Sequence, residues 1–107
     1  MEQEHANSEV ARIIRSLALK PHETKSTERA TYDMLSLGIT KDDVCDAIRQ
    51  WIDDRNDIEA KITAEVAEHQ GRTHYILKPA IKGESLYVKL DILENPYEHL
   101  VIVSCHK

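Results

Sequence analysis

Residues 83–107 have the sequence GESLYVKLDILENPYEHLVIVSCHK, in which two apolar runs lie on either side of a proline. Apolar and polar side chains alternate over residues 86–92, which is typical of a strand with one buried face. Asn95-Pro96 indicates a turn, and the nearly continuous apolar run over residues 100–105 is typical of an inner strand. The sequence therefore predicts two antiparallel strands that pair in this part of the chain.

The segment before these strands allows two structures. Residues 58–69 include many that favour helices, yet the residues from 62 to 66 also alternate as they would in a strand. The β-forming residues 73–77 follow after a plausible turn. We favour a hairpin over residues 62–77 and keep the helix as the alternative.

Two amphipathic helices are predicted at the start of the chain. Apolar residues recur at helical spacing from residue 8 to about residue 19, and Pro21 ends that segment. Ser26 or Thr27 can cap a second helix, which Gly38 ends in the left-handed conformation that glycine adopts easily.

The third helix has the clearest pattern. Thr40 and Asp43 form a capping box, with aspartate in place of the usual glutamate. An apolar stripe from Val44 to Ile52 follows, and it includes Trp51, which we expect to belong to the core.

Helices in the first part and strands in the second predict an α+β domain, with the helices packed on one face of an antiparallel sheet. The chain has 107 residues, which is long enough for one domain with a modest core. We therefore predict a single domain over residues 1–107, with residues 1–7 disordered.

Composition excludes several classes of protein. No apolar run approaches the roughly 20 residues of a membrane span. The polar, acidic N-terminal residues are unlike a signal peptide. We therefore expect a cytoplasmic protein without membrane contact, in which Cys45 and Cys105 are reduced thiols.

Charge is distributed unevenly along the chain. The formal net charge is −5, which argues against generic affinity for nucleic acid. Residues 1–71 hold 9 basic and 15 acidic residues, whereas residues 72–107 hold 5 basic and 4 acidic residues with three histidines. This asymmetry permits an anion-binding surface on the C-terminal part.

The alternating strand places a polar group on the sheet face away from the helices. Tyr87, Lys89 and Asp91 point to that face, because successive strand residues point in opposite directions. On the last strand, strict alternation separates residues 100, 102, 104 and 106 from residues 101, 103 and 105. The pattern leaves open which set shares the face of Tyr87. If His106 does, a polar cluster forms there, completed by His74 with Lys61 or Arg72.

The order of these elements and several strings resemble the MqsR family of toxins. The strings are VARIIRSLAL, STERATYDMLSLGITKDDVCDAI, THYILKP, GESLYVKLDIL and LVIVSCHK. The resemblance implies a RelE-like α+β fold and a metal-independent endoribonuclease, an mRNA interferase that needs no cofactor. It also implies a type II toxin–antitoxin system, in which a cognate antitoxin protein restrains the toxin.

The positions of the family's site fall on four residues of this chain. These catalytic positions are Lys61, His74, Tyr87 and His106, with Lys89 two residues after the tyrosine. His74 stands where the family has glutamine, and His106 stands where the family has lysine. The acidic net charge also differs from the basic charge usual in RNA-cutting toxins.

The residue types suit RNA cleavage without a metal ion. The reaction needs a base for the 2′-hydroxyl, cations for the phosphate and an acid for the leaving 5′-oxygen. Either His74 or His106 serves as the base and the other as the acid, while Tyr87 donates a hydrogen bond or stacks on a base. The RNA-binding cations are Lys61 and Lys89 at the phosphate, with Arg72 and Lys78 as peripheral contacts.

Two other functions fit the same sequence. One is a non-catalytic binding module that uses its acidic helical face to bind a partner protein. The other is a related domain that has kept the fold and lost the site. A metal site is disfavoured because the sequence has no CxxC or HxxxH pair.

Overall fold

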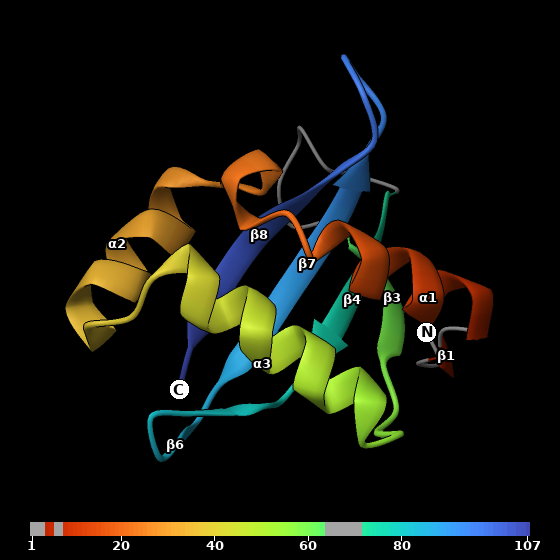
Figure 1. Ribbon diagram of the computed structural model, residues 1–107. Coiled ribbons are helices and arrows are strands. Elements are labelled where there is room, and N and C mark those ends of the chain that lie inside the picture. Colours follow the sequence, from red (N-terminus) through yellow and green to blue (C-terminus); the bar gives the residue numbers. More distant parts are fainter. Residues whose placement is uncertain (1–3, 6–7, 64–71) are drawn as a thin grey trace.

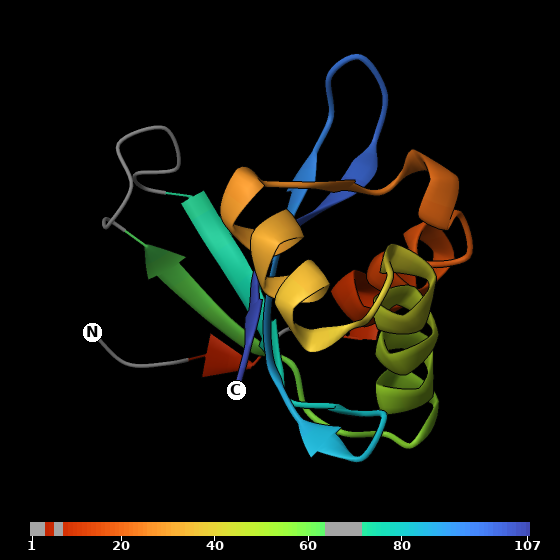
Figure 2. The same ribbon diagram turned by 90° about the vertical axis from the view of Figure 1, so that its left-hand side faces the viewer.

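The computed structural model describes residues 4–5, 8–63 and 72–107, and in these ranges three α-helices lie on one face of a sheet. The helices are α1 (Ser8–Leu17), α2 (Glu28–Leu37) and α3 (Lys41–Asp53), and a 3-10 turn, η1 (Pro21–Glu23), follows α1. Figure 2 shows α1 and α3 side by side, both on the same side of the sheet. The predicted α+β layout is confirmed.

The helix ends follow the predicted caps. The Thr27 hydroxyl accepts a hydrogen bond from the Ala30 N–H at the start of α2, and Gly38 ends that helix at φ 70°. At α3, Thr40 and Asp43 form the complete capping box. The pKa of Asp43 is lowered, chiefly by the hydrogen bond that its carboxylate accepts from the backbone of Thr40.

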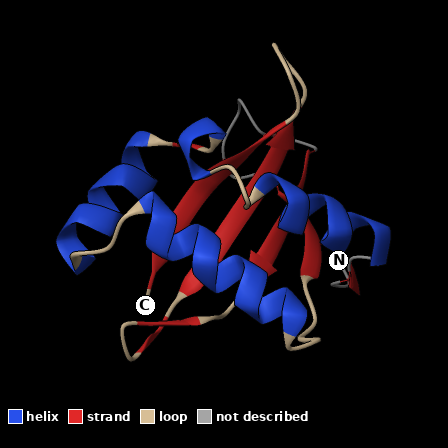
Figure 3. Cartoon of the chain, viewed as in Figure 1, coloured by secondary structure: helices blue, strands red, loops and turns tan. Residues whose placement is uncertain are grey.

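The described strands form a mixed sheet in the order β1-β3-β4-β7-β8-β2 (Figure 3). Their bounds are Glu4–His5 for β1, Lys25–Ser26 for β2, Glu59–Thr63 for β3, Arg72–Leu77 for β4, Tyr87–Leu93 for β7 and His99–His106 for β8. Neighbouring strands are antiparallel, as predicted, except that β2 runs parallel to β8. The prediction of a purely antiparallel sheet is therefore wrong at this edge, where a strand from the helical half of the chain joins the sheet. A separate small hairpin consists of β5 (Ala80–Ile81) and β6 (Glu84–Ser85).

The predicted hairpin forms, and β3 begins at Glu59, three residues before the predicted start. The helical alternative is therefore wrong for residues 59–63, while residues 64–71 lie outside the described residues. Glu4–His5 pair with β3, so the disorder predicted for residues 1–7 does not hold for these two. The other residues of that segment lie outside the described part.

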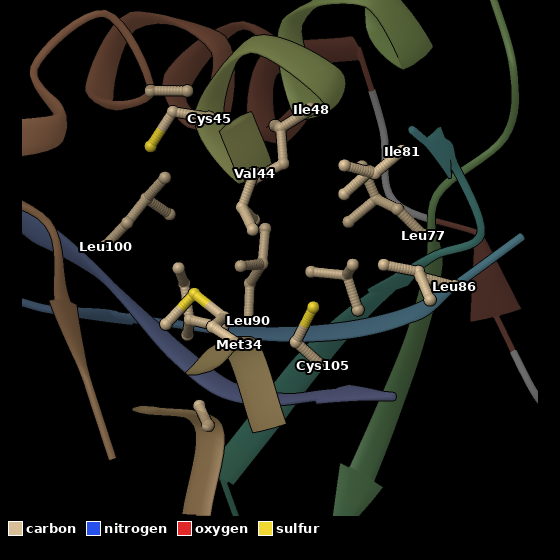
Figure 4. Packing of buried hydrophobic residues seen from close by; sticks show 14 of the residues in the cluster. Met34, Val44, Cys45, Ile48, Leu77, Ile81, Leu86, Leu90, Leu100 and Cys105 are labelled. Atoms are coloured by element: carbon tan, nitrogen blue, oxygen red, sulfur yellow. The ribbon is translucent and has the colours of Figure 1, made fainter. Parts of the chain in front are cut away.

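The core lies between the helices and the sheet. Figure 4 shows Val44 and Ile48 of α3 in the same buried cluster as Leu90 and Leu100 of the sheet. Each of these four side chains is fully buried, and burying one stabilises the fold by about 1.5–3 kcal/mol. No helix in the described ranges has both the length and the apolar character needed to cross a membrane.

Both cysteines are free thiols buried in this core, as predicted. Burial raises the pKa of the Cys105 thiol to about 11 and also raises the pKa of Cys45.

Strict alternation on the last strand is wrong, because β8 contains a β-bulge. Lys89 pairs with Ser104 and Leu90 pairs with Ile102, so Val103 is an extra residue on β8. The bulge reverses the parity of the strand. Leu100, Ile102 and Cys105 therefore belong to the core, whereas Ser104 and His106 lie on the other face with Tyr87 and Lys89.

Candidate functional site

The candidate site lies on the sheet face turned away from the helices, here called the outer face. The strand register brings the predicted residues to this face in pairs. His74 of β4 is opposite Lys61 of β3, and His106 of β8 is opposite Tyr87 of β7. The bulge in β8 decides the second pair, since without it His106 would share the face of Leu90.

Tyr87 and His106 form a stacked ring pair. Their ring centroids are 5.1 Å apart and their planes differ by 19°. His106 Nδ1 lies 2.9 Å from the backbone oxygen of Lys107. An oxygen of this kind only accepts, so Nδ1 carries the hydrogen and Nε2 of the neutral ring has the lone pair. The geometry gives Nε2 of His106 the form that a general base requires.

Lys89 adds a cation next to this ring pair. It lies two residues along β7 from Tyr87 on the same face, about 7 Å away along the strand. Ser104 is its partner across the strands and is buried. Among the described residues, neither Lys89 nor Lys61 forms an ion pair, so both ammonium groups are available to an anion.

Arg72 is bound to Asp91. Its Nε and one terminal nitrogen donate hydrogen bonds of 2.7 and 3.0 Å to the two carboxylate oxygens, and the same terminal nitrogen donates to the Ile92 oxygen. Burial raises the pKa of Asp91, but the hydrogen bonds and charge of Arg72 outweigh burial, and the pKa of Asp91 is lowered overall. The predicted role of Arg72 as a peripheral RNA contact therefore competes with a structural one.

His74 is buried beside the same carboxylate. Its Nε2 is 3.5 Å from Asp91 Oδ2, and both side chains are 2% exposed. His74 is therefore less accessible to a substrate than His106, which is partly exposed.

The two histidines do not come together. His74 contacts Asp91 and His106 stacks on Tyr87, and these two positions on β7 are four residues, about 13 Å, apart. His74 and His106 also lie on opposite sides of β7 in the strand order. A base and an acid that act on one phosphate must both reach it, and this spacing does not place both histidines on a single phosphate.

The remaining predicted contact, Lys78, follows β4 and is exposed. Its ammonium lies 3.5 Å from Glu59 Oε1, which partly neutralises it.

A pocket of about 460 Å³ lies at the other end of the face, lined by Arg72, Glu94 and neighbouring residues. The Glu94 carboxylate in its lining disfavours a phosphate ligand, so the ring pair with Lys89 is a better candidate site than this pocket.

Sequence reasoning missed the contact of Asp91 with Arg72 and His74. The parity of the strand placed Asp91 on the correct face, but a carboxylate there is usually solvated. The available signal was an arginine in the predicted turn, two residues before a histidine on the predicted strand of residues 73–77.

Cys105 lies on the core side of β8, whereas His106 lies on the outer face, so these two do not form a nucleophilic dyad. Within the described ranges, no three His, Cys, Asp or Glu side chains gather in a way that could hold a metal ion.

No family model, curated protein or solved structure matches this chain.

Proposed function

We propose that this protein is an endoribonuclease of the MqsR type, a toxin that cuts mRNA without a metal ion and is restrained by an antitoxin protein. The observation that carries the proposal is the gathering of Tyr87, Lys89 and His106 on the outer face. The resemblance to the MqsR family, with its RelE-like fold, supports the same assignment. Such a protein acts in the cytoplasm, where its substrate is translated.

The proposed reaction is an in-line attack within the RNA chain. His106 Nε2 takes the proton of a 2′-hydroxyl, and the 2′-oxygen bonds to the adjacent phosphorus. Lys89 stabilises the added negative charge on the phosphate oxygens. The bond from phosphorus to the 5′-oxygen then breaks, and the Tyr87 hydroxyl donates its proton to that oxygen. The products are a 2′,3′-cyclic phosphate and a 5′-hydroxyl.

Tyr87 is assigned as the acid because it contacts His106, whereas His74 does not. Lys61 lies on the same face, beside His74, and is assigned to a neighbouring phosphate of the RNA. Lys78 remains a peripheral contact that must leave Glu59 to reach RNA.

The test is incubation of the purified protein with a defined mRNA in EDTA, followed by mapping of the cut ends. We expect cuts at recurring sites with cyclic phosphate and 5′-hydroxyl ends, and their loss in His106→Ala. The matched control is His22→Ala, because the His22 side chain is 77% exposed and lies in η1, away from the outer face. Intact RNA with wild-type protein, both with and without translating ribosomes, would reject the proposal.

A second candidate function is a non-catalytic module that binds a basic partner through α3. Residues 42–59 hold seven acidic and two basic residues, a net charge of −5, which equals the net charge of the whole chain. Asp42, Asp46 and Asp54 are exposed on or just after α3. This function predicts a partner whose binding weakens when these three aspartates become asparagine, with no RNA cleavage in any variant.

A further inference from the structure

The outer face holds a buried carboxylate that the proposed reaction does not use. Asp91 is 1% exposed, although the alternation of β7 places it on the face without helices. Its Oδ1 accepts hydrogen bonds from Arg72 and from the Ile92 N–H, and its Oδ2 accepts one from the Arg72 Nε. A carboxylate that is removed from water remains ionised only when it is held in this way.

The same carboxylate is next to the His74 ring. The distance from Asp91 Oδ2 to His74 Nε2 is 3.5 Å, and both side chains are 2% exposed. Arg72, in contrast, is 41% exposed, so its charge is partly screened by water while that of Asp91 is not. A negative charge at this distance favours the protonated imidazole, whereas burial favours the neutral ring.

Other charged residues of the face also act on this ring. Lys61 is opposite His74 on β3, and Arg72 is two residues away on β4. Lys89 and Glu59 lie on the next row of the face, opposite Ile76. The cations oppose a positive charge on His74, whereas the Asp91 carboxylate, with Oδ2 at 3.5 Å from Nε2, favours it.

We infer that Asp91, anchored by Arg72, is a positioning residue whose negative charge keeps the His74 ring protonated. His74 then supplies a fixed positive charge beside Lys61, and the base of the site is His106 alone. The catalytic meaning of this inference rests on the proposed function. The link between Asp91 and the His74 proton is a property of the folded protein and is tested without RNA.

The experiment is an NMR titration of the histidine rings between pH 4 and pH 9. His74→Gln identifies the His74 signal by its disappearance. In Asp91→Asn the midpoint of the His74 titration falls by about one pH unit, because the ring loses its counter-charge. In Arg72→Gln the midpoint rises, because the carboxylate loses a competing cation. If the Arg72–Asp91 pair only stabilised the fold, the two variants would not shift the His74 midpoint in opposite directions.

An unchanged His74 midpoint in Asp91→Asn, or a shift in the same direction in both variants, overturns the inference. Circular dichroism and cooperative melting establish that each variant is folded. If Asp91→Asn does not fold, Arg72→Gln decides, because a rise supports the inference and a fall or no change rejects it.

The RNA assay separates this inference from the proposed function. If neither the wild-type protein nor any variant cuts RNA, the proposed function fails. The titration still decides whether Asp91 controls the protonation of His74. If the wild-type protein cuts RNA, the high-pH limb of its rate profile moves to lower pH in Asp91→Asn. A limb that does not move rejects a catalytic use of the His74 charge.

Discussion

The hydroxyl of Thr27 joins the start of α2 to the bulge of β8. It accepts a hydrogen bond from the Ala30 N–H and donates one of 2.8 Å to the oxygen of Val103, the extra residue of the bulge. The Thr27 N–H also donates to the Ile102 oxygen at 3.1 Å. One residue thus caps a helix and fixes the strand irregularity that turns His106 toward the outer face.

We expect Thr27→Ala to lower the free energy of unfolding by about 1–2 kcal/mol, because both hydroxyl hydrogen bonds are lost. Thr27→Ser keeps the hydroxyl and should recover most of this stability. Urea unfolding followed by circular dichroism measures both variants. Ser36→Ala, at an exposed position of the same helix, is the control and should change little. Equal stability of Thr27→Ala and wild type would mean that the bulge does not depend on this contact.

The Arg72–Asp91 pair makes stability depend on pH in the acid range. The pKa of Asp91 is lowered in the folded protein. The stability that the Arg72–Asp91 pair contributes is therefore fully present above the unfolded pKa of about 3.9. The contribution is lost as the pH falls below about 4 and through the folded pKa, because protonation then breaks the pair. Arg72→Ala leaves a buried carboxylate without its cation and should cost about 2 kcal/mol at pH 7, less than a fully buried pair.

Urea midpoints between pH 2.5 and pH 7 measure this dependence. Asp91→Asn should be less stable at pH 7 and should lose less stability than the wild type when acidified. Asp53→Asn is the comparison, since Asp53 is also ion-paired, with Arg15, but is more exposed. A parallel loss of stability in wild type and Asp91→Asn would contradict the assignment.

The stacked pair predicts different losses of activity for its two members. If the proposed function holds, His106→Ala removes the proposed base and should lower the cleavage rate by about 10²–10⁴-fold. Tyr87→Phe keeps the ring against His106 but removes the proton donor, so the rate should fall while RNA affinity is retained. Single-turnover cleavage rates and filter-binding affinities separate these effects. Full activity in Tyr87→Phe would show that another group protonates the leaving oxygen.

Burial should make both thiols unreactive in the folded protein. The pKa of Cys105 is about 11, so on the order of one thiol in a thousand is ionised at pH 8, and both side chains are fully buried. A thiol-specific chromogenic reagent should label neither cysteine in native protein and both in urea. Rapid labelling of Cys105 in native protein would mean that the contact of α2 with β8 opens readily.

The helices and the main strands could be predicted because their signals are local. The capping box at Thr40 and the alternation around Val88 each depend on residues a few positions apart. The bulge could not be predicted, because both candidate sets on β8 are mostly apolar and Val103 resembles its neighbours. The parallel pairing of β2 with β8 joins residues 25 and 101, and no local pattern in a two-residue strand indicates it.

The sequence indicates which residues lie on the outer face, but it does not indicate how far apart they lie. The outer-face positions of Tyr87, Lys89 and His74 follow from strand parity and register. The distance between His74 and His106 depends instead on the order and offset of three strands, which the sequence does not specify. The burial of Asp91 also could not be predicted, because it depends on an arginine from another strand.

In the sheet, β8 lies between β7 and β2, although it follows both in the chain. Ribosomes add about 5–20 residues per second from the N-terminus, so α2 and β2 emerge before the strand on which they pack has been made. His106, which completes the ring pair with Tyr87, is joined after every other proposed site residue. A chain that has emerged only as far as β7 therefore lacks the strand that joins β7 to β2, and it lacks the His106 ring that stacks on Tyr87.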